Sequence, residues 1–171
     1  MSSRSIRLVA APILAAALAF SMSSCSVLDS VFGTPSAPVR DSQTGEITEG
    51  NDKADVFALR VGDCMNESTG STEVSSVPTV PCAEAHDEEI YHSFMMKDGD
   101  FPGDSAITAE SEKVCTPEFE SFIGISYDES TLDWYPFTPT AGSWGEGDRE
   151  VLCVAWDPAG KVTGSLKGAA R

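Results

Sequence analysis

The sequence contains few basic residues. Only 11 of its 171 residues are Lys or Arg, against 27 Asp and Glu, so the formal net charge is −16. Two of the basic residues, Arg4 and Arg7, lie at the N-terminus. Binding to DNA, RNA or another phosphate polymer depends on cationic side chains that release counterions. The composition therefore excludes nucleic acid as a partner and predicts repulsion from anionic lipid headgroups.

The sequence also lacks an apolar run of membrane-spanning length near its N-terminus. The run from Leu8 to Phe20 is 13 residues long, whereas a transmembrane helix needs about 20. A short apolar run that follows basic residues such as Arg4 and Arg7 is typical of a secretory signal peptide. We therefore expect residues 1–24 to be removed when the chain is exported.

Small residues lead into Cys25. They are Ser-Met-Ser-Ser, and the next charged residue is Asp29. This segment resembles the lipobox of bacterial lipoproteins, in which the signal peptide is cut before a cysteine that carries a diacylglyceryl group. The resemblance implies that Cys25 bears fatty acyl chains such as palmitate, which anchor the chain to the extracytoplasmic face of the cell membrane. An ordinary cleavage site, with Cys25 incidental, is the alternative.

Residues 25–54 are rich in Ser, Thr, Pro, Gly, Asp and Glu and have few large apolar side chains. Such a segment buries too little apolar surface to offset the entropy of ordering the chain. We therefore predict a flexible tether here, although its apolar stretch at 27–32 could instead lie on the membrane. The remaining residues, 55–171, have the length of one domain.

The sequence has no C-x₂₋₄-C pair, which is the usual spacing of a structural zinc site. Four cysteines follow Cys25, an even number that predicts disulfides in an exported chain. Three pairings are possible. We favour Cys64 with Cys82, at the ends of two predicted strands joined by a polar loop, and Cys115 with Cys153, which would join a helix to a strand.

Hydrophobic periodicity predicts an α+β domain, with an antiparallel sheet and one helical layer. Strands are expected at 56–61, 89–96, 151–156 and 162–167, of which the third is central. Residues 107–123 carry an apolar helical stripe. Pro117 is expected to kink this helix or to begin a second one, and Gly124 to end it. The polar segment 65–79 is predicted to be a loop.

Few residues of the sequence are suited to catalysis. The two histidines, His86 and His92, would lie about 20 Å apart on a strand and on different faces of a helix. The sequence has no zinc-protease motif, serine-hydrolase elbow or phosphate-binding loop. The acidic turn at 98–104 lacks the ligand pattern of a calcium loop. We therefore expect no catalytic residue, no metal and no cofactor.

Residues 132–144 are dense in aromatic side chains and contain two prolines, so we predict an irregular segment. Aromatic side chains on a loop are typical of interfaces and of grooves for extended ligands, although they could instead cover the core. We expect Trp144 in the core, and Trp134 and Tyr135 on a surface loop. The candidate binding residues are Trp134, Tyr135, Trp144, His86, Asp148 and Arg149, of which the last two could form a structural pair.

Several short motifs follow one another in a specific order. They are Val61-Gly-Asp-Cys64, Val80-Pro-Cys82, His86-Asp87, Pro139-Thr140, Ser143-Trp144, Gly147-Asp-Arg149, Cys153 and Thr163-Gly-Ser-Leu-Lys167. Together they resemble the septum-formation family of actinobacterial lipoproteins, over nearly all of residues 61–167. That family often has Pro before the histidine, where this chain has Ala85. The resemblance implies a role in division or in the envelope and assigns no reaction.

These observations lead to a functional hypothesis. We expect a non-enzymatic module, lipid-anchored outside the cell membrane, that binds a protein partner of the envelope or the division machinery. The alternative is a secreted hydrolase or a cell-wall-modifying enzyme. A cleft in which His86, Asp87 and Asp148 converge would favour the enzyme, and an exposed aromatic surface would favour binding.

Overall fold

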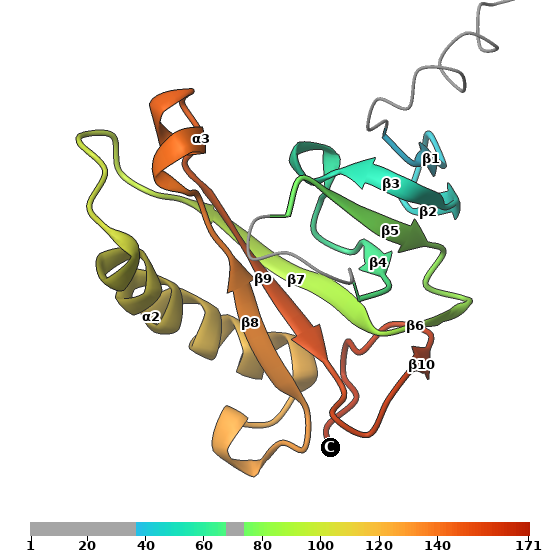
Figure 1. Ribbon diagram of the computed structural model, residues 1–171. Coiled ribbons are helices and arrows are strands. Elements are labelled where there is room, and N and C mark those ends of the chain that lie inside the picture. Colours follow the sequence, from blue (N-terminus) through green and yellow to red (C-terminus); the bar gives the residue numbers. More distant parts are fainter. Residues whose placement is uncertain (1–36, 68–73) are drawn as a thin grey trace, which may run out of the picture. The chain divides into compact units, whose positions relative to one another are not determined.

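The computed structural model describes residues 37–67 and 74–171 (Figure 1). They belong to one folded unit. The predicted signal peptide and Cys25 lie outside the described residues. Within the described ranges, no helix combines the length and the apolar composition of a membrane span.

A six-stranded antiparallel sheet forms the centre of the fold. Its strands lie in the order β3-β5-β4-β7-β9-β8, which leaves β3 and β8 at the two edges. Their bounds are β3 (Asn51–Asp55), β5 (Ser76–Val80), β4 (Cys64–Met65), β7 (Glu88–Met95), β9 (Glu150–Trp156) and β8 (Asp133–Phe137). Two further antiparallel pairs are β1 (Val39–Arg40) with β2 (Ile47–Glu49), and β6 (Ala85–His86) with β10 (Val162–Thr163).

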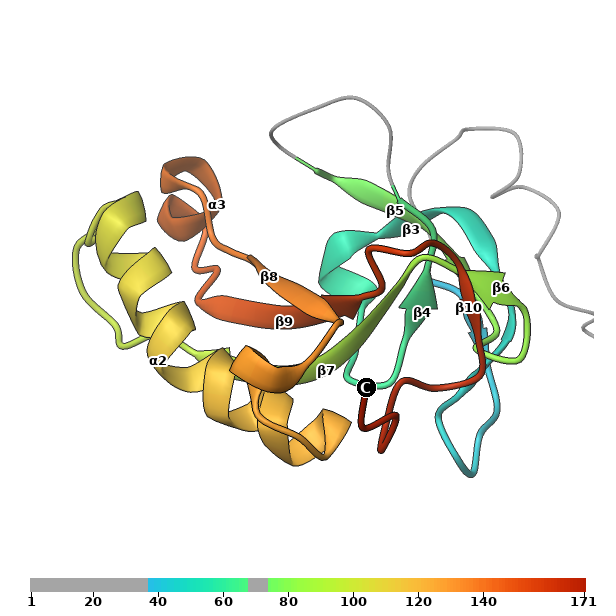
Figure 2. The same ribbon diagram turned by 90° about the horizontal axis from the view of Figure 1, so that it is seen from below.

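One long helix, α2 (Asp104–Ile123), lies along one face of strands β7, β9 and β8 (Figures 1 and 2). Its buried residues recur at every fourth position and form one stripe; they are Ile107, Ser111, Cys115, Phe119 and Ile123. The helix continues through Pro117, so a second helix does not begin there. Gly124 ends the helix in a left-handed conformation (φ 95°), as predicted. With one main helix on an antiparallel sheet, the predicted α+β class is confirmed.

Short helical segments connect the remaining elements. They are the 3₁₀ turns η1 (Val56–Ala58) and η2 (Tyr127–Glu129) and the helix α3 (Ala141–Gly145). Thr140 caps α3 by accepting a hydrogen bond from the backbone N–H of Ser143 (3.1 Å). This cap fixes the direction of the chain between the edge strand β8 and the central strand β9.

Strand β9 lies inside the sheet between β7 and β8 and, as predicted for a strand buried on both sides, contributes to apolar clusters on both faces. On the side of α2, Cys153 and Ala155 belong to a cluster that includes Tyr91, Cys115, Phe119, Ile123, Leu132 and Leu166. On the opposite side, Leu152 and Val154 pack in a second cluster with Leu59, Met65, Val77 and Ile90. A third cluster joins Ile107, Trp144 and Val151. The sheet is therefore covered by apolar packing on both faces.

Both predicted disulfides are present, and the alternative of a four-cysteine zinc site is therefore excluded. Cys115 and Cys153 have Cα atoms 5.7 Å apart and join α2 to β9, with both residues fully buried. Cys64 and Cys82 have Cα atoms 5.1 Å apart and join β4 to the turn after β5. The polar chain between them contains β5, so residues 76–79 form a strand where the composition predicted a loop.

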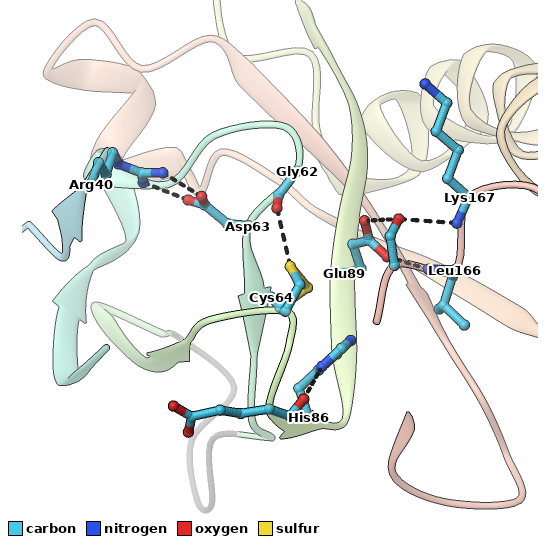
Figure 3. Close-up of a disulfide and its surroundings, with 11 residues drawn as sticks. Arg40, Gly62, Asp63, Cys64, His86, Glu89, Leu166 and Lys167 are labelled. Atoms are coloured by element: carbon cyan, nitrogen blue, oxygen red, sulfur yellow. Dashed lines mark hydrogen bonds and ion pairs between the residues drawn. A yellow bond between two sulfur atoms is a disulfide. The ribbon is translucent and has the colours of Figure 1, made fainter. Parts of the chain in front are cut away.

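The folded region begins earlier in the chain than residue 55, where the sequence placed the end of the tether. Residues 39–55 form β1, β2 and β3, and Ala54 is fully buried. Figure 3 shows why this polar segment is ordered: the guanidinium of Arg40 holds both carboxylate oxygens of Asp63. Arg40 also donates to the carbonyl of Ala58 (3.1 Å). A nearly buried ion pair replaces the apolar contacts that the composition lacks.

Two predicted strands differ from the structure. In place of a strand at 56–61, Asp55 accepts a hydrogen bond from the N–H of Phe57 (2.9 Å) and caps the turn η1. Leu59 is buried, whereas Phe57 is 67 % exposed. The predicted strand at 162–167 is shortened to Val162–Thr163, because the segment that follows is bound by Glu89 instead of by a neighbouring strand.

Candidate functional site

Two adjoining hollows lie beside β8, next to the apolar cluster that faces away from α2. They share Val74 and Phe137 and therefore adjoin, and we call the two hollows together the groove. We call the first the aromatic hollow, of about 500 Å³; Val56, Phe57, Pro136 and Thr140 also line it. We call the second the acidic hollow, of about 550 Å³. Volumes of this size are typical of ligand sites in proteins.

The acidic hollow combines carboxylates with aromatic side chains. Its carboxylates are Glu67, Asp87, Glu88, Asp133 and Asp157, and its aromatic residues are Trp134, Tyr135, Phe137 and Trp156. Three elements bring them together, because β7 starts at Glu88, β8 pairs with β9, and Asp157 follows the end of β9. Residues far apart in the sequence therefore line one concave surface.

Glu88 is the most unusual carboxylate in this hollow. It is only 8 % exposed, and its side chain accepts a hydrogen bond from the hydroxyl of Tyr135 (2.8 Å). Burial raises the pKa of Glu88, and the nearby negative charges of Asp87 and Glu67 raise it further. The pKa of Tyr135 is also raised, by its burial and by the charge of Glu88. The groove thus holds a carboxylate that is crowded by like charges.

Cations accompany two of the five carboxylates. Lys161 lies 3.0 Å from Asp87, and Arg171 lies 2.6 Å from Asp157. Burial alone would raise the pKa of each of these aspartates, but backbone N–H donors and the neighbouring cation outweigh it, so both pKa values are lowered. Asp133 instead accepts a hydrogen bond from the hydroxyl of Tyr127 (2.6 Å), which raises the pKa of Tyr127 to about 12.

The aromatic hollow is bordered by an exposed ring. Phe57 is the most exposed large apolar residue among those described, at 67 %. Asp148 lines the same hollow and accepts a hydrogen bond from the hydroxyl of Ser143 (2.8 Å). Through this bond Asp148 supports the start of α3. The hollow therefore has an exposed apolar edge at Phe57 and a hydrogen-bonded polar wall at α3.

Trp144 belongs to the core, as the sequence led us to expect. It is 5 % exposed, its indole N–H donates to the carbonyl of Gly99 (2.9 Å), and it meets Phe101 edge to face. The guanidinium carbon of Arg149 lies 3.8 Å above its ring. Arg149 pairs with Asp98 (3.3 Å), and its contact with Asp148 is to the backbone carbonyl. Asp148 and Arg149, predicted as a structural pair, are therefore joined through the backbone of Asp148.

Trp134 and Tyr135 line the acidic hollow, but in a different setting from the predicted surface loop. Both are half-buried residues of the edge strand β8. Trp134 packs with Tyr127 and the cluster beneath α2, whereas Tyr135 packs with Phe137 on the other cluster. Prolines did not prevent a strand here, because an edge strand tolerates the missing N–H of Pro136.

His86 lies apart from both hollows. It is fully buried in β6, and its Nδ1 is 2.9 Å from the carbonyl oxygen of Glu84. Figure 3 shows His86 among the residues that surround the disulfide of Cys64, near Glu89. Asp87 lines the acidic hollow and Asp148 the aromatic hollow. The three side chains that a hydrolase would need do not converge.

Glu89 anchors the last part of the chain. It is 2 % exposed and accepts hydrogen bonds from the hydroxyl of Ser165 (2.7 Å) and from the N–H of Leu166 (2.6 Å). Burial raises its pKa, although these two donors oppose the rise. Glu88 and Glu89 are neighbours in β7, yet Glu89 binds the C-terminal segment, whereas Glu88 lines the groove.

Sequence reasoning missed several groove residues: Phe57, Glu67, Glu88, Trp156 and Asp157. Phe57 was expected within a strand at 56–61 that does not form. The hydrogen bond from Tyr135 to Glu88 joins residues 47 positions apart, so no local sequence pattern predicts it. A usable signal was the pair of adjacent glutamates at the start of an otherwise apolar strand.

The geometry defines a small, disulfide-bonded α+β protein with an acidic and aromatic groove on its sheet. A family model described as Septum formation matches residues 61–170, from the turn before β4 to the penultimate residue. The chain belongs to the septum-formation family. Comparisons with curated proteins and with solved structures found no match.

Proposed function

We propose that this protein is a lipid-anchored module outside the cell membrane that binds a protein partner during septum formation and performs no catalysis. The family membership links the chain to septum formation. The groove beside β8 is the observation that supports binding, because it joins an exposed apolar edge to a set of polar and aromatic side chains. Such a combination is typical of interfaces.

Phe57 offers a direct test of the groove. Its side chain is 67 % exposed at the aromatic hollow, so Phe57→Glu removes apolar contact area without disturbing the core. Met95 has almost the same exposure, 65 %, and lines neither hollow, which makes Met95→Glu a matched control. Each variant is expressed as the full chain with a labelling enzyme, and its neighbours and position in dividing cells are recorded.

We expect the Met95 variant to be enriched at the septum and to label the same neighbours as the unchanged protein. The Phe57 variant should lose those neighbours by about tenfold or more, the size of an interface hot spot. If the two variants label the same neighbours at the same level, the groove is not the binding surface. If the unchanged protein shows no septal enrichment, the proposed role is wrong.

The proposed anchor rests on Cys25. Cys25→Ala removes the thiol that would form the thioether to lipid, so we expect no fatty-acid label on this variant and its release from the membrane fraction. The measurement is metabolic labelling with a radioactive fatty acid, followed by detergent phase separation. A Cys25→Ala protein that keeps the label and stays with the detergent phase would show that the anchor lies elsewhere.

A further inference from the structure

We infer that the groove takes an extended, basic segment of the partner protein, with an arginine or lysine side chain in the acidic hollow. This inference rests on the proposed binding function and names the chemistry of the occupant. Ion pairs reach Asp87 and Asp157 within the described part of the chain, whereas Glu67, Glu88 and Asp133 have no ion pair there. A cation placed among these three would meet uncompensated negative charge at close range.

The charge of the whole molecule favours the same occupant. With a net charge of −16, the protein attracts basic segments and repels acidic ones before contact. Inside the hollow, burial raises the pKa of Glu88, and the negative charges of Asp87 and Glu67, which line the same hollow, raise it further. A cationic side chain would reduce that repulsion and favour the ionised form of Glu88.

The aromatic walls select a cationic side chain over a metal ion. Among the described residues, the group with three potential ligand atoms within 4.8 Å of one another is Cys64, Cys82 and Glu89, and its cysteines form a disulfide. The carboxylates of the hollow are therefore too dispersed to ligate one ion. Tyr135 and Trp156 instead offer ring surfaces on which a guanidinium or ammonium group is attracted.

The same molecule contains an example of this contact. Arg149 lies 3.8 Å above the ring of Trp144 and also pairs with Asp98. One guanidinium thus satisfies an aromatic ring and a carboxylate together. The acidic hollow presents the same two kinds of group in Trp156 and Asp133, which are cross-strand partners on β9 and β8 and both line it.

Because the two hollows of the groove adjoin, we expect the occupant to be longer than one residue. Val74 and Phe137 line both hollows, so a chain whose cation enters the acidic hollow can place an apolar side chain beside Phe57. The expected ligand is a short peptide that alternates or combines basic and apolar residues.

The test uses an array of random nonapeptides, probed with the full chain in non-ionic detergent. Three forms are compared: the unchanged protein, Glu67→Gln with Glu88→Gln, and the control Glu112→Gln with Glu120→Gln. Glu112 and Glu120 are exposed on α2 and line neither hollow, so the control carries the same change of charge on another face. Affinities of the selected peptides are then measured by the fluorescence of the tryptophans.

We expect the peptides selected by the unchanged protein to be enriched in Arg and Lys. Their affinity should fall about tenfold or more in the Glu67 and Glu88 variant and less than threefold in the control. Replacing arginine with uncharged citrulline in the best peptide should cause a similar loss. Equal losses in both variants would mean attraction by net charge alone and would overturn the inference.

Two further outcomes separate this inference from the proposed function. Selected peptides that are not basic, yet lose affinity through Phe57→Glu, would leave the groove as the binding surface and overturn the basic occupant. If no peptide is selected, or if the selected peptides bind Phe57→Glu as well as the unchanged protein, both the occupant and the groove as a peptide-binding surface are wrong.

Discussion

At the scale of single residues, the clearest division is between aromatic residues of the core and those of the groove. Trp144 is 5 % exposed and has its polar N–H satisfied by Gly99. Trp134 is half-buried on an edge strand and lines the acidic hollow. Two tryptophans ten positions apart therefore have different roles, and their exposures distinguish them as expected from the sequence.

Replacing Trp144 with Ala should lower the free energy of unfolding by about 3 to 5 kcal/mol, because a large buried side chain leaves a cavity. The change also removes the ring contacts with Phe101 and Arg149. Trp134→Ala should cost clearly less, because this residue is only partly buried. Urea denaturation of the two variants provides the measurement. A Trp144 variant as stable as the unchanged protein, or a Trp134 variant that fails to fold, would contradict this assignment.

Glu88 makes the stability depend on pH. Its pKa in the folded state is raised above the ordinary 4.5, so the folded protein binds this proton more tightly than the unfolded chain does. The stabilisation from protonation is complete below pH 4.5 and is lost as the pH rises through the folded-state pKa. We therefore expect Glu88→Gln to be more stable than the unchanged protein at pH 7, with the gain disappearing near pH 4. Thermal melts at both values, on folded samples, measure the difference.

Glu112→Gln is the control for this pH effect, because it removes an exposed carboxylate of α2. It should shift the melting temperature little at either pH. A Glu88→Gln protein that is less stable at pH 7 would mean that the hydrogen bond from Tyr135 outweighs the cost of burying the charge.

At the scale of elements, the two disulfides have different structural roles. Cys115–Cys153 joins the only long helix of the described residues to the central strand, and both sulfurs are buried. Cys64–Cys82 closes a shorter loop at the side of the sheet, and Cys82 is partly exposed. The first holds two layers together, whereas the second restrains one connection.

Removing each disulfide should therefore have unequal effects. The sequence separations of 38 and 18 residues correspond to loop-closure contributions of about 4 and about 3 kcal/mol. Replacing Cys115 and Cys153 with Ala should lower stability more than replacing Cys64 and Cys82 with Ala. Denaturant unfolding of the two double variants gives the comparison. A larger loss from the Cys64 and Cys82 variant would show that the bridge between α2 and β9 is not the more important of the two.

The elements also show which parts of the fold the sequence could predict. The helix stripe and the apolar run of β9 were recognisable because burial sets their periodicity. The strand expected at 56–61 failed because Asp55 caps a turn there, so Phe57 points outward. Strand β3 was missed because an edge strand needs few apolar residues.

The candidate site was less predictable than the fold. Tyr135 and Trp134 were found from their aromatic density, although the strand that carries them was not. Glu88 could not be recognised, because its burial depends on the pairing of β7 with β9 and of β9 with β8. Tertiary contacts, and not local patterns, create the acidic hollow.

At the scale of the whole molecule, negative charge and the position of the groove act together. A protein with a net charge of −16 repels anionic surfaces, so basic segments are favoured in the encounter with a partner. This effect is screened over about 8 Å at physiological ionic strength. Discrimination between basic partners therefore depends on contacts inside the groove.

The ion pair of Arg40 with Asp63 has a consequence for distance from the membrane. Because it holds β1 in the folded unit, ordered structure starts by residue 37, only twelve residues after Cys25. A fully extended chain covers at most about 3.6 Å per residue, or roughly 40 Å over this stretch. Under the lipid anchor proposed for Cys25, the start of the described fold would lie within that distance of the bilayer. Breaking the ion pair would release β1 and lengthen the chain between the anchor and the folded unit. Arg40 would therefore set how far from the membrane a partner can be met.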